Sequence, residues 1–325
     1  MERRRADAPR VSVVVPVYMA EPWIGSTIES VQAQTLAGWE MVIVDDGSPT
    51  DQRPAVQRFL DTDSRIRFFR QPNGGADQAR NAGFAQVAPG VDFVLFLDQD
   101  DLLETDALET MAGYLDANPD AGMAFCDRTI IDSENLPIDI YLGDRIPRFV
   151  PHSLWVRRLP DNHPQTPLMS FFAYNIAVPS GTMLRTSIFA ATGGWDERLD
   201  FYGDDDMWVR MTLISQAHYL PRPLLRRRVH GKQLTRSPRA EARLREARAI
   251  YLHKWRSPDW LPAEQQALIR QAWRFKEGRV LPSLWFSWAR ERLRRRDFAE
   301  AVRCVLRGLR QLAMHGPRAL DLGSA

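Results

Sequence analysis

The sequence predicts an α/β fold built on a mainly parallel sheet flanked by helices, followed by an all-α C-terminal extension. Between residues 11 and 127, short apolar segments typical of buried strands alternate with amphipathic segments typical of helices. Such alternation is typical of right-handed βαβ units, whose helices cover the faces of the sheet. Beyond residue 238 the pattern is helical throughout, which predicts the extension.

The first part of the chain contains most of the expected strands. They cover residues 11–18, 39–48, 65–71, 91–101 and 121–127, with helices expected within residues 21–35, 73–88 and 104–118. The first strand, VSVVVPVY, is apolar on both faces, as in a parallel strand that is covered on both sides. The first helix has Pro22 in its opening turn and repeats Trp23, Ile28 and Val31 at helical spacing.

The rest of the chain is less regular. Residues 128–170 contain six prolines, and we expect a long irregular segment with a functional role there. A strand, a short helix and a Gly-Gly turn are expected within residues 179–199. A helix is expected at 204–215, then a strand from residue 223 that runs into a basic loop. The last helix, 298–313, has its apolar residues on one face and arginines opposite.

The distribution of charge marks a boundary within the chain. Residues 226–325 contain 24 Lys and Arg against 9 Asp and Glu, a net charge of +15, whereas the remaining residues carry a net charge of −13. We therefore expect an N-terminal tail at 1–10, a catalytic domain at 11–237 and a basic helical extension at 238–325. Such a charge split indicates that the extension lies near an anionic partner.

Composition indicates an ordinary soluble globular protein. The 325 residues are 44% hydrophobic and 26% charged, which lies in the usual range. Cys126 and Cys304 are too few for a disulfide framework, and no apolar run is long enough for a signal peptide or a membrane span. We expect a cytoplasmic protein that does not bind nucleic acid.

Several enzyme classes lack their usual motifs in this chain. There is no Gly-x-Gly-x-x-Gly, no Walker A loop and no Gly-x-Ser-x-Gly, which disfavours nicotinamide chemistry, P-loop phosphoryl transfer and acyl hydrolysis. Acids remain at the ends of the expected strands: Asp45, Asp46, Asp98, Asp100, Asp101 and Asp127. Because ligands of open parallel sheets bind outside the carboxyl ends of the strands, we expect these acids to form one site.

The stretch FVLFLDQDD, residues 93–101, predicts a bound cation. It places three carboxylates within four positions after a buried strand. Two like charges about 4 Å apart repel by roughly 4 kcal/mol at an effective dielectric near 20. A hard divalent ion removes that cost, and oxygen ligands suit Mg²⁺ or Mn²⁺. The alternative is a solvated strand end.

Four segments together resemble family 2 glycosyltransferases. They are residues 11–51, NGGADQARNAGF, FVLFLDQDD and GGWDERLDFYGDDDMWVRM, in the order and approximate spacing of that family. The likeness covers about residues 11 to 230. It implies the Rossmann-like GT-A fold and an inverting transfer of a sugar from a nucleoside diphosphate donor, usually with Mg²⁺ or Mn²⁺. Such an ion neutralises the charge that develops on a diphosphate leaving group.

The resemblance also implies roles for individual residues. For the nucleotide, Pro16 and Tyr18 would line the base pocket, and Asp45 and Asp46 would contact base and ribose. Arg80 would brace the nucleotide, and Asp98 would face the ribose. For the metal, Asp100 would hold the ion with help from Asp101, and His230 would complete the site. A carboxylate can accept a hydrogen bond from the ring N–H of uracil, which favours UDP as the carrier.

The catalytic base is expected in YGDDDMWVR. An inverting transfer needs a base that takes the proton of the attacking acceptor hydroxyl. The family supplies an Asp from a Glu-Asp motif. Counting back from Arg210 puts Asp204 at the base position and Gly203 in place of the Glu. A shift of one residue makes Asp205 the base instead. We favour Asp204. Acids at the start of a helix also complement its dipole, which is the alternative role of these residues.

The expected function is therefore glycosyl transfer to a glycan or lipid-linked acceptor in bacterial surface polysaccharide or glycoconjugate synthesis. The basic extension, with its tryptophans Trp255, Trp260, Trp273, Trp285 and Trp288, would suit peripheral contact with anionic lipid at the inner membrane face. A sugar nucleotidyltransferase is one alternative, although PVYMAEPW lacks the glycine-rich, lysine-bearing loop that it needs. A catalytically inactive, nucleotide-sugar-binding subunit is another, because Gly203 replaces an acid.

Overall fold

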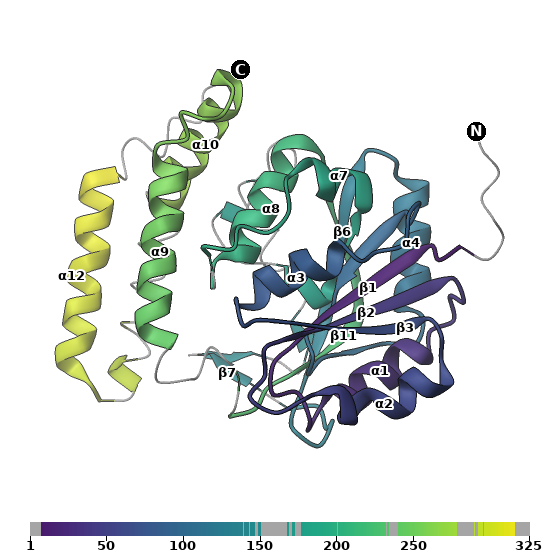
Figure 1. Cartoon of the computed structure of the whole chain (residues 1–325). Helices are drawn as coiled ribbons and strands as arrows, with labels where there is room; N and C mark the ends of the chain where they lie inside the picture. Colours follow the sequence, from purple (N-terminus) through teal and green to yellow (C-terminus); the bar gives the residue numbers. More distant parts are fainter. Residues whose placement is uncertain are drawn as a thin grey trace.

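A central sheet with helices on both faces forms the body of the protein, and a group of helices lies beside it (Figure 1). The computed structural model describes residues 8–138, 140–142, 144–146, 149–150, 168, 171–172, 177–199, 201–231, 233, 240–277, 289, 292–294 and 296–315.

The sheet is mainly parallel, as the sequence predicts. Its strands are β1 (Val11–Val17), β2 (Trp39–Asp46), β3 (Ile66–Gln71), β4 (Phe93–Phe96), β5 (Leu102–Leu103), β6 (Ala121–Ile131), β9 (Phe149–Val150), β10 (Thr182–Arg185) and β11 (Gln216–Arg228). The order is β3-β2-β1-β4-β10-β6-β11-β5, with β9 paired to β6. Parallel pairing joins β1 to β2 and to β4, β2 to β3, and β6 to β11. Antiparallel pairing joins β10 to β4 and to β6, β5 to β11, and β9 to β6. A separate hairpin joins β7 (Ile140–Leu142) to β8 (Asp144–Ile146).

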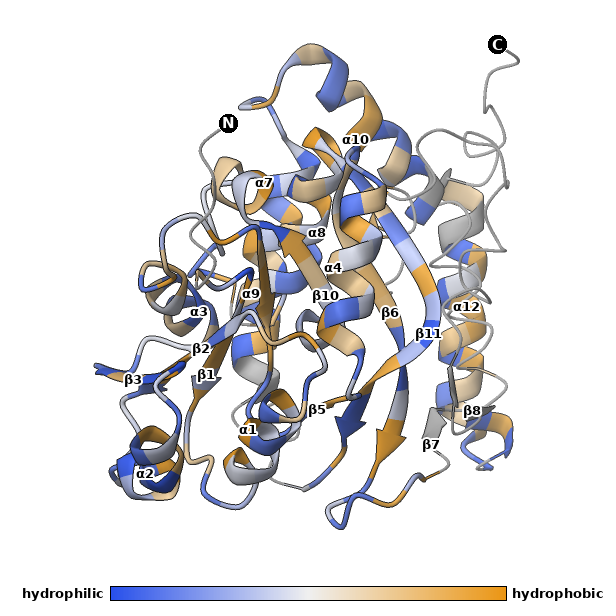
Figure 2. Ribbon diagram, turned by 90° about the vertical axis from the view of Figure 1, so that its right-hand side faces the viewer, coloured by the Kyte–Doolittle hydropathy of each residue, from blue (hydrophilic) through white to orange (hydrophobic). Residues whose placement is uncertain are grey.

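Helices bury both faces of this sheet. One face is covered by α1 (Ile24–Gln32), α2 (Arg53–Thr62) and α4 (Ala107–Ala117), and the other by α3 (Ala76–Phe84), α7 (Thr186–Ala191) and α8 (Gly203–Ile214). Along β1, Val13 and Val15 pack on the first face and Val14 on the second. This alternation explains why the strand is apolar throughout, and hydrophobic colour marks β6 and β10 in Figure 2 for the same reason.

The expected strands and helices of the first part are confirmed, with shorter ends in most cases. Two details differ. Pro22 precedes α1, which begins at Ile24. Asp127 is not at a strand end, because pairing with β9 and β11 extends β6 to Ile131. Asp127 is buried within the strand and accepts a hydrogen bond of 2.6 Å from the hydroxyl of Tyr219. Its carboxylate is therefore held by β11, although the pairing of β4 and β6 with β10 leaves Asp127 level with Asp98 across the sheet.

The C-terminal region is helical, as predicted, and packs on α8. It comprises α9 (Ala240–Arg256), α10 (Ala263–Phe275) and α12 (Phe298–His315). One apolar cluster joins the two sides, and its members include Leu199, Val209, Tyr251, Trp255, Ile269 and Trp273. Among the described residues, none of the helices is both long and apolar enough to cross a bilayer.

The tryptophans of this region do not form one surface. Trp255 and Trp273 are buried in the shared cluster, so neither can face a membrane, contrary to expectation. Trp260 is 53% exposed. Trp285 and Trp288 lie outside the described residues.

A buried polar contact reinforces the junction between α8 and α9. The carboxylate of Asp206 is fully buried and lies 2.7 Å from Nε of Arg210 and 2.8 Å from Nζ of Lys254. The indole N–H of Trp255 donates to the same carboxylate at 2.9 Å. Because a buried charge is stable only when it is paired, this contact holds α9 against the first turn of α8.

We expect Trp255→Ala to lower the free energy of unfolding by about 3–5 kcal/mol, because it opens a cavity in the shared cluster and removes a hydrogen bond to buried Asp206. Urea denaturation followed by circular dichroism measures the change. Trp260→Ala is the matched control, and we expect it to cost clearly less. If Trp255→Ala and Trp260→Ala lowered the free energy of unfolding equally, the buried contact at the junction would have no special stabilising role.

Candidate active site

The predicted nucleotide residues gather at the carboxyl ends of β1, β2 and β4. Pro16 is buried near the end of β1, and Tyr18, just beyond it, is exposed. The side chain of Gln99 holds the backbone of Tyr18, with Oε1 accepting from its N–H at 2.6 Å and Nε2 donating to its carbonyl at 3.0 Å. The segments after β1 and β4 are therefore tied together beside the exposed ring.

Asp45 and Asp46 shape the loops of the site. Asp45 is buried, and its Oδ1 accepts the backbone N–H of Ser48 at 3.0 Å. Asp46 accepts the backbone N–H groups of Gly74 and Gly75 at 2.9 and 2.8 Å. Gly47 is required between the loops, because its φ is +66° and an added Cβ would lie 2.5 Å from the backbone nitrogen of Asn73.

Arg80 bridges two carboxylates beneath this edge. Its Nη1 lies 2.7 Å from Asp77 and its Nη2 lies 2.8 Å from Asp98, while the guanidinium is 4.9 Å from the ring centre of Trp195. Burial alone would lower the pKa of Arg80, but the charges of Asp98 and Asp77 raise it above its ordinary value. Arg80 is thus a fixed positive charge, as a brace for a nucleotide must be.

Asp100 and His230 form the second predicted cluster. His230 Nε2 lies 2.8 Å from Asp100 Oδ2, and its ring stacks on Trp23 at 5.1 Å between centroids. Burial, followed by the charge of Asp98, raises the pKa of Asp100 to about 6.

Asp101 lies behind this pair. It is buried and its Oδ1 accepts the backbone N–H of Arg228 at 2.9 Å, which anchors β11 to the segment after β4. Burial, followed by the charges of Asp100 and Asp98, raises the pKa of Asp101 to about 8.

The donor set fits a hard divalent ion that shares its coordination with substrate. Within the described residues, no three His, Cys, Asp or Glu side chains are arranged to hold a metal by themselves. Mg²⁺ in such sites is usually held by one or two protein carboxylates, with substrate phosphates and water supplying the rest. Asp100 offers one such carboxylate, and the imidazole of His230, from another segment of the chain, lies 2.8 Å from it.

The three acids in the first turn of α8 have different surroundings. Asp206 is committed to Arg210, Lys254 and Trp255, so it is not available as a base. Asp204 is partly exposed and accepts the backbone N–H of Asp205 at 3.0 Å. Asp205 is also partly exposed as a residue. Burial of its carboxyl group, then the charge of Asp204, raises the pKa of Asp205 well above its ordinary value, and the charge of Lys276, which follows α10, opposes the shift.

Sequence reasoning missed several residues of the site. Asp77 lies three positions before Arg80 in the same helix, a spacing that could have indicated the ion pair. Ser180 accepts the backbone N–H of Asp98 at 3.1 Å, and the positive charge of Lys276, from the extension, lowers the pKa of Asp205. Nothing in the local sequence indicates these last two, because both come from distant segments.

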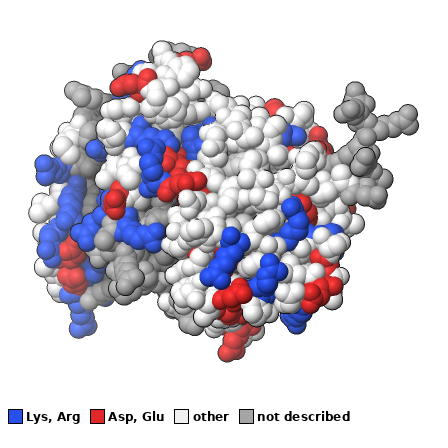
Figure 3. All heavy atoms as spheres, viewed as in Figure 1, with Lys and Arg blue, Asp and Glu red and all other residues white. Residues whose placement is uncertain are grey.

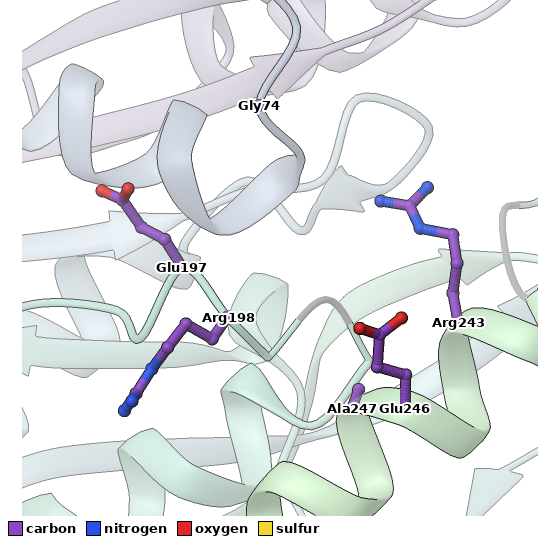
Figure 4. A pocket seen from close by; sticks show the side chains of 6 residues that line it. All are labelled: Gly74, Glu197, Arg198, Arg243, Glu246 and Ala247. Carbon is purple, nitrogen blue, oxygen red and sulfur yellow. The ribbon is translucent and has the colours of Figure 1, made fainter.

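An open pocket lies between α9 and the loops beside α3 (Figure 4). The space within it, about 470 Å³, includes open solvent, and the pocket is lined by Gly74, Glu197, Arg198, Arg243, Glu246 and Ala247. None of the predicted site residues lines it, although Gly74 also bonds Asp46. Its mixed charges suit a polar ligand rather than an apolar one.

Comparison with known proteins identifies the class. The model of the family described as "Glycosyl transferase family 2" matches residues 12–192, more than half of the chain. The chain therefore belongs to glycosyl transferase family 2. The match ends before Asp204, Asp205 and His230.

Individual relatives agree with this assignment. An uncharacterized glycosyltransferase of Rickettsia typhi is 27% identical over 233 residues, which cover 70% of this chain and 66% of that protein. The uncharacterized glycosyltransferase EpsJ of Bacillus subtilis is 34% identical over 34% of this chain and 31% of its own length. Similarly, the match to y4gI of Sinorhizobium fredii covers only 14% of that protein.

A solved structure shows the same fold. Residues 1–349 of S. aureus TarS superpose with a TM-score of 0.54 at 16% identity, over 93% of this chain and 91% of the TarS chain. The same TarS fragment has been solved with UDP-GlcNAc, with a TM-score of 0.54, and with UDP, with a TM-score of 0.52. The predicted GT-A fold with a helical C-terminal region is confirmed.

We expect Arg80→Met to lower the free energy of unfolding by about 3–5 kcal/mol, because it leaves the carboxylates of Asp77 and Asp98 without their shared partner. Urea denaturation measures the loss. Arg58→Met is the matched control, since Arg58 and Glu29 form a pair whose side chains are 69% and 57% exposed, and such pairs contribute about 0–1 kcal/mol. A similar cost for both variants would contradict the bridging role of Arg80.

Proposed function

We propose that this protein is an inverting glycosyltransferase that moves a sugar from a nucleoside diphosphate donor, UDP in particular, to a hydroxyl of a glycan or lipid-linked acceptor. One observation carries the proposal. In a chain of family 2, the acids that follow β4 are held by basic side chains from other segments: Arg80 of α3 bonds Asp98, and His230, after β11, bonds Asp100. Surface polysaccharide or glycoconjugate synthesis is the proposed setting.

The nucleotide is proposed to lie across the ends of β1, β2 and β4. Tyr18 offers an exposed ring, and Asp45 and Asp46 would contact base and ribose. Asp98, held by Arg80, would face the ribose on the other side. The crystal structures of the TarS fragment with UDP and UDP-GlcNAc support a uridine donor for this fold. We propose residues 11–237 as the catalytic domain and 238–325 as its extension.

Asp100 and His230 are the proposed metal ligands, with Asp101 fixing the chain behind them. Bound there, Mg²⁺ or Mn²⁺ would neutralise negative charge on the departing diphosphate. The indole of Trp23 stacks on His230 and orients its imidazole for this task. The guanidinium of Arg228 lies over the same indole and brings a permanent positive charge near the proposed metal ligands.

Asp204 is the proposed base. As the acceptor oxygen attacks the anomeric carbon from the face opposite the diphosphate, a carboxylate oxygen of Asp204 takes the hydroxyl proton. The C–O bond to the diphosphate breaks in the same step, so the configuration inverts. Asp205 suits this task less, because burial favours its neutral form. Its backbone N–H instead holds Asp204 in place.

We expect wild-type protein with Mn²⁺ to release UDP from a UDP-sugar, and Asp204→Asn to lower that rate by about 10²–10⁴-fold, because the amide cannot accept the proton. A coupled assay for UDP across a panel of UDP-, GDP- and dTDP-sugars measures both. Asp205→Asn is the matched control, with a smaller expected loss. A larger loss for Asp205→Asn would move the base to that residue. No release from any donor would favour a binding subunit.

We also propose that α12 contacts the inner face of the membrane. Phe298, Val302, Leu306 and Leu309 recur on one side of this helix and are 51–63% exposed. Arg303 and Arg307, also exposed, flank that stripe and outnumber their partner Glu300. Figure 3 shows Lys and Arg side chains along the outer side of the extension. An apolar stripe beside arginines suits the surface of an anionic bilayer.

We expect the full chain to float with vesicles that contain phosphatidylglycerol and much less with pure phosphatidylcholine, because the arginines need anionic headgroups. Leu306→Glu should abolish flotation by placing a charge in the apolar stripe. Leu244→Glu is the matched control, since Leu244 is an exposed leucine of α9. Flotation that is the same for both variants would contradict contact through α12.

A further inference from the structure

The start of α8 is shaped around a carboxylate from another helix. A Cβ added to Gly203, the first residue of α8, would lie 1.9 Å from Oδ2 and 2.7 Å from Cγ of Asp77 in α3. Gly203 is not one of the glycines with positive φ, so its backbone does not require glycine. The position lacks a side chain because the carboxylate of Asp77 occupies the space.

This carboxylate is part of the charge network of the site. Asp77 is 3% exposed, and its Oδ1 lies 2.7 Å from Nη1 of Arg80. The other terminal nitrogen of Arg80 bonds Asp98. One guanidinium therefore links the acid at the end of β4 to a carboxylate that touches the first turn of α8. The positive end of the α8 dipole favours a negative charge at that place.

Asp204 directly follows the contact. Its position relative to the sheet edge depends on where the first turn of α8 lies, and the Asp77 side chain packs against that turn at Gly203. A base must lie within hydrogen-bond reach of the acceptor hydroxyl, and a displacement of about 1 Å can cost on the order of 100-fold in rate.

We propose that Asp77 is a positioning residue, which supplies from α3 the carboxylate that the Glu of a Glu-Asp motif would carry at position 203. It sets the first turn of α8, and with it Asp204, relative to Arg80 and Asp98. This inference rests on the proposed function. It also removes the reason for regarding Gly203 as a sign of lost activity, because the charge is kept and only its place in the sequence differs.

Exchanging the two positions tests the proposal. We expect Asp77→Ala to lower kcat on the order of 100-fold, with a smaller change in the KM for the donor, because Asp204 is misplaced while the nucleotide residues remain. Asp77→Ala removes the three atoms nearest the added Cβ, so Gly203→Glu becomes sterically possible in that background. The double variant should recover at least tenfold of the lost kcat.

Matched variants separate positioning from folding. Gly113→Glu in the Asp77→Ala background adds the same side chain to α4, where an added Cβ meets nothing within 4 Å, and it should restore no activity. Gly203→Ala alone should lower the melting temperature, and the same change should be tolerated when residue 77 is alanine. Asp77→Asn, which keeps the shape, should lower kcat while the melting temperature changes less than in Gly203→Ala.

The possible outcomes are distinct. An active wild type, with a double variant no faster than Asp77→Ala, contradicts the assignment of Asp77 and leaves the proposed function intact. The assignment is also contradicted if Asp77→Ala and Asp77→Asn lower the melting temperature so far that unfolding alone explains the fall in kcat. A wild type that turns over no nucleotide sugar contradicts the proposed function itself.

Discussion

Compensation of buried negative charge at the carboxyl edge of the sheet is the constraint on which the rest of the site depends. These carboxylates come from α3, from the segment after β4 and from α8. Arg80 pairs with Asp77 and Asp98. His230 bonds Asp100, and Arg210 and Lys254 pair with Asp206. Because unpaired buried charges are costly, these pairs hold the elements of the site in register.

The same constraint makes the helical extension part of the site's support. Lys254 and Trp255 of α9 reach the carboxylate of Asp206, and Lys276, after α10, acts on Asp205. The shared apolar cluster closes around these polar contacts. The first turn of α8 is therefore bounded by α3 on one side and by the extension on the other, and this is the turn that carries the proposed base.

Much of the fold was predictable because strand and helix periodicities are local properties. The strands β1 to β4 lie where apolar runs predict them. The end of β6 was not predictable, since pairing with β9 and β11, rather than the residues of β6, extends it past Asp127. The same holds for the tryptophans of the extension. Composition placed them among arginines, but packing buries Trp255 and Trp273 and leaves Trp260 partly exposed.

By itself, the sequence determined the class of fold, the order of the strands along the chain and the acids that follow them, because these depend on neighbouring residues. Only the tertiary structure decided what each acid does. Asp101 faces the backbone of Arg228, Asp206 is enclosed by α9, and Asp77 fills the space beside Gly203. The physical reason is that the protonation and orientation of a carboxylate are set by the groups that surround it, and here those groups come from segments far apart in the chain.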